Sequence, residues 1–142
     1  MSMSDYRAAV AQVKKARQDA KRAMHAAFSE ACAGLFKAHP ELTSFAWQQY
    51  TPYFNDGDAC EFSARVEEPD INEVSGYDID EGWTDREGNK RGGEHAALVP
   101  LQEAVAELLQ EFDQEDLKEM FGDHMTVTVT PDGITTDDCE HD

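Results

Sequence analysis

Residues 4–38 constrain the fold more than any other part of this chain, because they contain no proline and only one glycine, Gly34. Alanine, the strongest helix former, is the commonest residue in this stretch. His39 and Pro40 then disfavour any continuation of the helix. The sequence therefore predicts one helix over 4–38, about 50 Å long at about 1.5 Å per residue. Such a helix is longer than a small domain is wide, so we expect it to be an interaction element.

The apolar stripe of this helix is wide from Met24 onward and narrow before Ala20. We expect the C-terminal half to pack on the core and the N-terminal half to project or to pair with another chain. The apolar positions recur close to every 3.5 residues, as in a coiled coil, but are mostly alanine. This predicts a homodimer through residues 5–30, either parallel or antiparallel. The expected dimer residues are Tyr6, Val10, Val13, Lys14, Arg17 and Lys21.

The charge of the chain is strongly acidic and unevenly distributed. It has 30 acidic and 12 basic side chains, a formal net charge of −18. Residues 1–40 hold seven basic and three acidic side chains, so residues 41–142 carry −22. A field of that sign repels nucleic acid and anionic lipid and attracts basic protein surfaces. Because 40% of the residues are hydrophobic, the composition favours a folded core beneath an acidic surface over a disordered acidic tail.

The remaining elements predict a single α+β domain over residues 1–142, with an antiparallel sheet of two hairpins and helices on one face. Two alternating stretches joined through Asn55-Asp56-Gly57 predict the first hairpin, and the alternation from Met125 to Thr130 predicts the second. Residues 67–95 are rich in glycine and acid without periodicity, so we expect a long functional or mobile loop. The expected boundaries are a hairpin at 44–66, helices at 100–121, a hairpin at 124–136 and a frayed tail at 137–142.

One segment carries a resemblance. From Trp47 to Gly57 the chain reads W-x-Q-Y-T-P-Y-F-N-D-G, followed by Cys60 and Phe62. This segment resembles a signature of small uncharacterised proteins of tailed bacteriophages and some bacteria. The likeness covers about twenty residues, and that group has no activity that could be carried over to residues of this chain. The resemblance implies a phage origin and hence a protein that acts on host machinery.

Acidic side chains supply the first candidate site. Glutamates spaced by four residues form a row along the predicted helices, although like charges at this spacing weaken a helix. The row either imitates the spaced charges of a nucleic-acid backbone or is an ordinary solvated face. The acidic loop is not an EF-hand, because Trp83 and Asn89 stand where that motif needs Gly and Glu. The expected partner-binding residues are Glu103, Glu107, Glu111, Glu115, Glu119, Asp78, Asp80 and Glu81.

An aromatic cluster in the first hairpin supplies the second candidate site. Trp47, Tyr50, Tyr53 and Phe54 either stack on a ligand or fold onto the hairpin's own core, and we favour the core. With the 67–95 loop closing over them, these rings would suit a small nucleotide-like ligand. Arg65, Arg86, Lys90 and Arg91 would have to converge, or a divalent cation intervene, for an anionic ligand to bind.

Catalytic and metal motifs are absent from the sequence. The five histidines and three cysteines lack zinc spacing, and no nucleophile elbow, phosphate loop or dinucleotide fingerprint occurs. The chemistry left to an enzyme is hydrolysis by carboxylates or a metal, using Asp78, Asp80, Asp85 or Glu87. We therefore expect no enzyme, cofactor or metal. The N-terminal residues lack an apolar signal core, no apolar run could span a bilayer, and an odd cysteine count favours reduced thiols in the cytoplasm.

These observations lead to two hypotheses. The first is a non-enzymatic acidic binding protein, encoded by a phage, that occupies a basic nucleic-acid-binding surface of a host protein. The second is a small-ligand binding or sequestering module built from the aromatic hairpin and the 67–95 loop.

Overall fold

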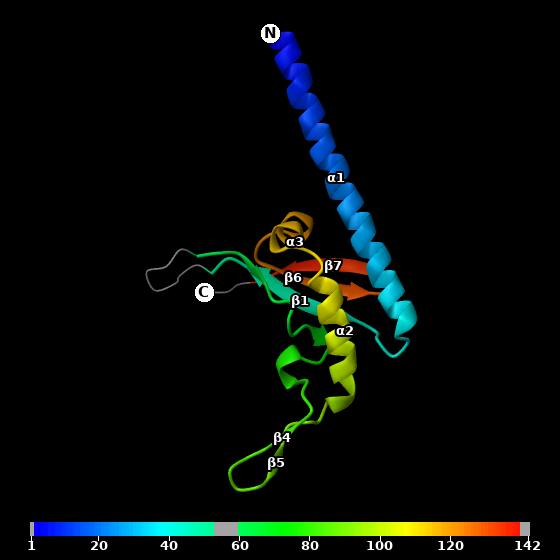
Figure 1. The fold of residues 1–142 in the computed structure, drawn as a ribbon, viewed down its shortest axis with the longest axis vertical. Helices are drawn as coiled ribbons and strands as arrows, with labels where there is room; N and C mark the ends of the chain where they lie inside the picture. Colours follow the sequence, from blue (N-terminus) through cyan, green and yellow to red (C-terminus); the bar gives the residue numbers. More distant parts are fainter. Residues whose placement is uncertain (1, 53–59, 140–142) are drawn as a thin grey trace.

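The computed structural model describes residues 2–52 and 60–139 and has an α+β fold (Figure 1). A long N-terminal helix stands against a small antiparallel sheet, and two shorter helices complete the body. The helices are α1 (Met3–Ala38), α2 (Val99–Leu109) and α3 (Gln114–Phe121), with short 3₁₀ turns η1 (Gly76–Asp78) and η2 (Ala96–Leu98). The strands are β1 (Phe45–Tyr50), β2 (Ser63–Ala64), β3 (Asp70–Ile71), β4 (Trp83–Thr84), β5 (Lys90–Arg91), β6 (Met125–Thr130) and β7 (Gly133–Asp138).

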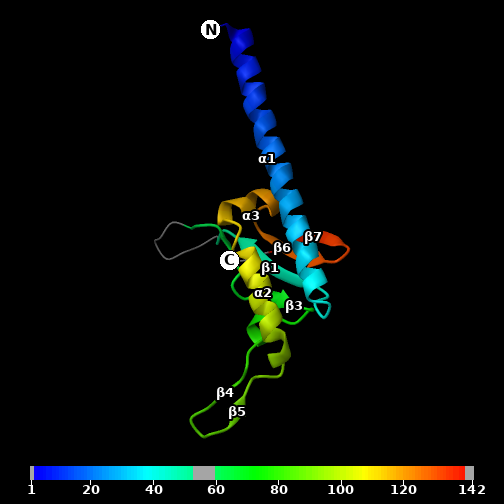
Figure 2. The same ribbon diagram turned by 45° about the vertical axis from the view of Figure 1, so that its right-hand side comes forward.

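The long helix matches its sequence prediction closely. Ser2 caps α1, since its side chain accepts a hydrogen bond from the backbone N–H of Asp5. The helix ends at Ala38, and the backbone N–H of the capping residue His39 still donates to the carbonyl of Leu35. Figures 1 and 2 show that only the C-terminal half lies against the body, while the N-terminal half extends away from it.

The main sheet has the strand order β2-β1-β6-β7, and β3 pairs with β1 on the same side as β2. All of these pairings are antiparallel. In the central pair, Phe45 lies opposite Val129 and Trp47 opposite Val127. Because side chains alternate along a strand, these four point to one face, and all are buried there.

The three helices cover that face. Phe28 of α1 is 0% exposed and makes edge-to-face ring contacts with Trp47, Phe112 and Phe121. The ring of His25 lies edge-on to Phe121, and its Nε2 lies 3.1 Å from the carbonyl oxygen of Met120. The fold is therefore the predicted helix-on-sheet arrangement, with one aromatic cluster joining α1, α3 and β1.

Two expected boundaries differ from the structure. The 67–95 segment is not a structureless loop, because β3, η1 and the small β4–β5 hairpin lie within it. These elements are two or three residues long, too short to show any periodicity in the sequence. The tail is also not frayed from residue 137, because β7 pairs with β6 through Asp138 opposite Met125. Tyr53, Phe54 and the expected turn at residues 55–57 lie outside the described residues.

Candidate functional site

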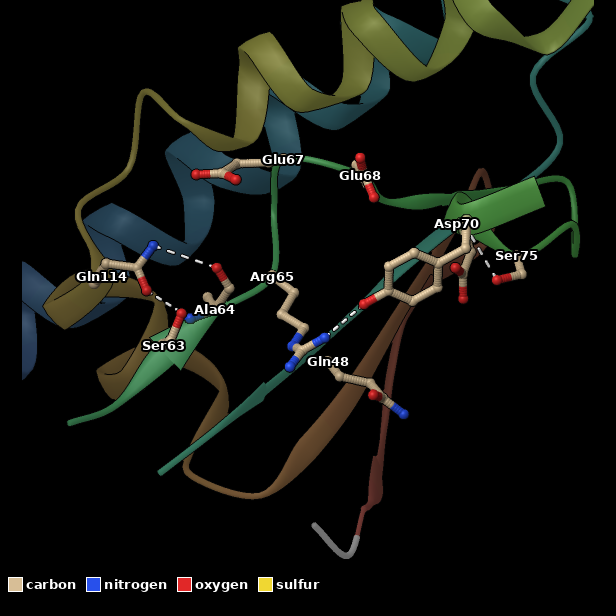
Figure 3. A pocket seen from close by; sticks show the side chains of 10 residues that line it. Gln48, Ser63, Ala64, Arg65, Glu67, Glu68, Asp70, Ser75 and Gln114 are labelled. Carbon is tan, nitrogen blue, oxygen red and sulfur yellow. Dashed lines mark hydrogen bonds between the residues drawn. The ribbon is translucent and has the colours of Figure 1, made fainter. Parts of the chain in front are cut away.

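A surface pocket of about 610 Å³ lies where β2 and β3 leave a gap beside β1 (Figure 3). Gln48 of β1 and Arg65, which follows β2, reach into it, and Glu67, Glu68 and Asp70 supply three carboxylates. Because Arg65, one of the cations of the predicted ligand site, lines this pocket, its polar groups test whether it can hold an anionic ligand.

Arg65 is held by two tyrosines. Its guanidinium donates to the hydroxyl oxygens of Tyr50 and Tyr77, and its Cζ lies 5.2 Å from the centroid of the Tyr50 ring. Partial burial would lower the pKa of Arg65, but attraction to the oxygens of both tyrosines raises it above its ordinary value. The arginine is therefore a cation fastened to the protein's own side chains.

Other polar groups of this pocket brace the backbone. Asp70 accepts a hydrogen bond from the N–H of Gly76 at 2.8 Å, and Gln114 Oε1 accepts one from the N–H of Ala64. Gly76 packs so closely that a Cβ there would lie 1.9 Å from the carbonyl oxygen of Glu68. With three carboxylates around one engaged arginine, the pocket suits a nucleotide phosphate poorly, and its geometry is that of a structural junction.

The aromatic hairpin is part of the core. Trp47 is buried, and its indole N–H donates to Oε1 of Gln49 at 2.9 Å. Gln49 is 0% exposed, and its Nε2 donates to the carbonyls of Leu117 and Gly122 at 2.8 and 2.7 Å. This network fastens β1 to the C-terminal end of α3. Trp47 belongs to the core cluster, which confirms the favoured interpretation for this ring. Tyr50 is also buried, and its ring lies against Arg65.

Thr51, in the segment 47–57 that resembles the phage signature, also helps to hold the fold together. Asp123 accepts hydrogen bonds from the N–H and the hydroxyl of Thr51, at 2.8 and 2.7 Å. Burial raises the pKa of Asp123, but the bonds from Thr51 and from the His124 N–H outweigh it and lower the pKa below its ordinary value. Within the described part of the segment, the side chains of Trp47, Gln49 and Thr51 therefore hold the fold together.

The five glutamates of the predicted row are all exposed, but they do not form one line. Glu103 and Glu107 lie on α2, Glu111 lies in the turn after it, and Glu115 and Glu119 lie on α3. Figure 1 shows α2 and α3 running in different directions, so the turn splits the row into two separate acidic faces.

The three expected partner-binding acids of the 67–95 segment differ in exposure and in hydrogen bonding. Asp78 and Glu81 are exposed, whereas Oδ1 of Asp80 accepts hydrogen bonds from the N–H groups of Gly82 and Gly93 at 2.8 and 2.7 Å. Asp80 thereby closes the base of the β4–β5 hairpin. It is a structural residue, and Asp78 and Glu81 are the two of this set that face solvent.

The β4–β5 hairpin forms an arm that hangs away from the body beyond the start of α2 (Figures 1 and 2). Asp85 organises its tip, accepting from the N–H groups of Glu87 and Asn89 and from Nε of Arg91. These hydrogen bonds, above all the one from the Asn89 N–H, lower the pKa of Asp85 below its ordinary value. Trp83 on this arm is 59% exposed. No periodicity in the sequence marks Trp83 as a surface residue, because the strand that holds it is only two residues long.

The expected dimer residues lie on the projecting half of α1. Tyr6 and Val13 are exposed and Val10 is partly exposed, as the narrow apolar stripe predicts. Lys14, Arg17 and Lys21 are also exposed beside them. The structure thus leaves the apolar side chains of Tyr6 and Val13 exposed to solvent.

Two of the three cysteines, Cys32 and Cys139, have thiols that burial makes less reactive. Burial raises the pKa of the Cys32 thiol to about 12, so it is protonated at neutral pH. Burial likewise raises the pKa of Cys139. Within residues 2–52 and 60–139, no three His, Cys, Asp or Glu side chains gather as metal ligands. None of the helices in these ranges has the length and apolar character needed to cross a lipid bilayer.

No protein-family model, curated protein or solved structure matches this chain. What this protein binds must therefore be inferred from the chemistry of its surfaces.

Proposed function

We propose that this protein is a non-enzymatic binding protein whose acidic body docks on a basic protein surface. The basic nucleic-acid-binding groove of a host protein fits this charge best, and the resemblance of the signature segment to phage proteins supports such a target. The expected setting is the cytoplasm of the host cell.

The uncompensated charge of the body carries this proposal. Residues 41–142 hold 27 acidic and five basic side chains. Among the described residues of this part of the chain, one carboxylate, that of Asp85, pairs with a lysine or arginine. Arg65 is engaged by tyrosines, and Lys118 lies 5.5 Å from the centroid of the Phe62 ring. Most of the acidic charge is therefore available to an external partner.

The acidic face of α2 is the best-placed part of that surface. Glu103 and Glu107 lie one helical turn apart on its exposed side, and Leu101, Val105 and Leu109 hold the other side in the core. Asp78 and Glu81 add two exposed carboxylates in the segment that precedes α2. Charges on a rigid helix lose little conformational freedom on binding, which favours affinity.

The test is capture of partners from bacterial lysate on the immobilised full-length protein, followed by a salt gradient. We expect nucleic-acid-binding proteins to be retained at low salt, to elute as salt rises and to be displaced by duplex DNA, because both ligands would compete for one groove. Retention of neutral or acidic proteins alone, with no effect of salt, contradicts the proposal.

Matched charge removals locate the surface. Glu103→Gln with Glu107→Gln removes two charges from α2, and Asp137→Asn with Asp138→Asn removes two from β7. We expect the double substitution in α2 to weaken capture about tenfold and the one in β7 to weaken it much less. Both variants lose the same total charge, so a difference between them would show that α2 contacts the partner directly. Equal losses from both pairs would rule out the α2 face as the docking site.

A further inference from the structure

The projecting half of α1 carries an apolar stripe that the described body leaves uncovered. Met3, Tyr6 and Val13 are 67%, 57% and 50% exposed. Residues 3–22 span about 30 Å of helix. A helix of about this length has little stability in water unless its apolar face is buried. We therefore expect another protein surface to cover this stripe along its length.

A groove at the base of this stripe offers a place for the end of a second helix. It lies between α1 and α3, has a volume of about 500 Å³ and is lined by Ala20, Met24 and Met120. Arg17 and Lys21 border it on the α1 side, and Asp116 and Glu119 border it on the α3 side. Ala20 and Met24 follow Tyr6, Val10 and Val13 at helical spacing, so stripe and groove form one continuous apolar track.

We infer that this track is occupied by the α1 helix of a second copy, running antiparallel. With the two-fold axis near Val13, Tyr6 of each copy faces Ala20 of the other. Met3 then enters the groove beside Met24 and Met120 of the other copy. The two grooves supply apolar area that a short, alanine-rich helix pair would lack by itself.

Charge decides between the two directions of pairing. Residues 3–22 carry six basic and two acidic side chains, whereas the body carries −22. Parallel pairing would bring the two basic ends together and the two acidic bodies together. Antiparallel pairing places the basic end of each copy beside the acidic α3 of the other, with Arg7 close to Asp116 and Glu119. Opposite charges meet at both ends of the track only in the antiparallel arrangement.

The oligomeric state of the full-length protein tests the inference. Light scattering at micromolar concentration should give about twice the chain mass of 15.9 kDa. Val13→Asp should raise the dimer dissociation constant about tenfold or more, because it places a charge at the centre of an apolar seam. The matched control is Ala8→Asp on the opposite side of the same helix turns, which should leave the dimer intact. Val13 and Ala8 are both exposed, so neither substitution should lower the melting temperature of the body.

A monomeric wild-type protein, or a dimer that tolerates Val13→Asp as well as Ala8→Asp, overturns the inference. Binding of α1 to a different protein or to nucleic acid instead of a second copy would give the monomer result and also overturns it.

Zero-length cross-linking tests the direction. A carbodiimide couples lysine amines to nearby carboxylates, and a mixture of light and isotopically heavy protein identifies couplings between copies. In Arg7→Lys, which supplies an amine at the position that the antiparallel arrangement places beside α3 of the other copy, inter-copy links are expected from residue 7 to Asp116 or Glu119. Inter-copy links confined to matching levels of the two helices, such as Lys15 to Asp19, would show parallel pairing and contradict the assignment.

Discussion

The two halves of α1 share one helix and one apolar face but differ in what that face meets. In the C-terminal half, Phe28, Cys32 and Phe36 are buried against the sheet and the other helices. In the N-terminal half, Tyr6 and Val13 stand in solvent. The backbone is helical throughout, so local preference sets the length of the helix while side-chain size sets where it packs. We therefore propose that the half of the helix that continues beyond its own body forms one side of an interface.

The largest expected effect is on the free energy of unfolding, which substitutions in the two halves of α1 should change by different amounts. Phe28→Ala removes a fully buried ring that contacts three others, and it should lower the free energy of unfolding by about 3–5 kcal/mol. Tyr6→Ala should change the unfolding of the dissociated chain by less than about 0.5 kcal/mol. Denaturant unfolding at low protein concentration measures both. Similar losses would show that the projecting half packs on its own body.

The second prediction concerns the buried network that joins β1 to α3. Gln49→Ala leaves the indole N–H of Trp47 and the carbonyls of Leu117 and Gly122 without that partner. We expect a loss of about 3 kcal/mol, since buried polar groups without partners are costly. The neighbouring Gln48→Ala is the matched control, because Gln48 is only partly buried on the other side of the strand. Equal losses from both substitutions would refute a special role for Gln49.

The structure shows which elements of the fold can be predicted from the sequence and which cannot. The bounds of α1 and the presence of the second hairpin are predictable because proline, alanine content and alternation act locally. The short elements of 67–95 are not, because Asp70, Asp80 and Asp85 fix them through side-chain hydrogen bonds to the backbone. In the sequence those acids resemble surface charges.

The candidate sites also combine features that local sequence predicts with features that depend on contacts between distant parts of the chain. The preference for a buried Trp47 follows from hairpin alternation, but the role of Gln49 does not, because its carbonyl partners lie 68 and 73 residues away along the chain. The split of the glutamate row depends on the angle between α2 and α3, which is set by packing.

The smallest expected effect lies at the end of β1. Asp123→Asn weakens the bonds from Thr51 and should cost about 1 kcal/mol at pH 7. Because the folded pKa of Asp123 is lowered, its contribution is present above its unfolded pKa of about 4 and is lost as pH falls through the folded value. Unfolding of both proteins between pH 7 and pH 3 measures this. The difference between them should shrink below about pH 4, and a difference that grows there would contradict the assignment.

Amide hydrogen exchange along α1 at several protein concentrations tests most directly whether a second copy orders the projecting half. Residues 24–36 should be protected at every concentration, because their protection comes from the body's own core. Residues 8–20 should be protected at high concentration and lose that protection on dilution or in Val13→Asp. Protection of residues 8–20 that is independent of concentration, or absent at all concentrations, would contradict this account.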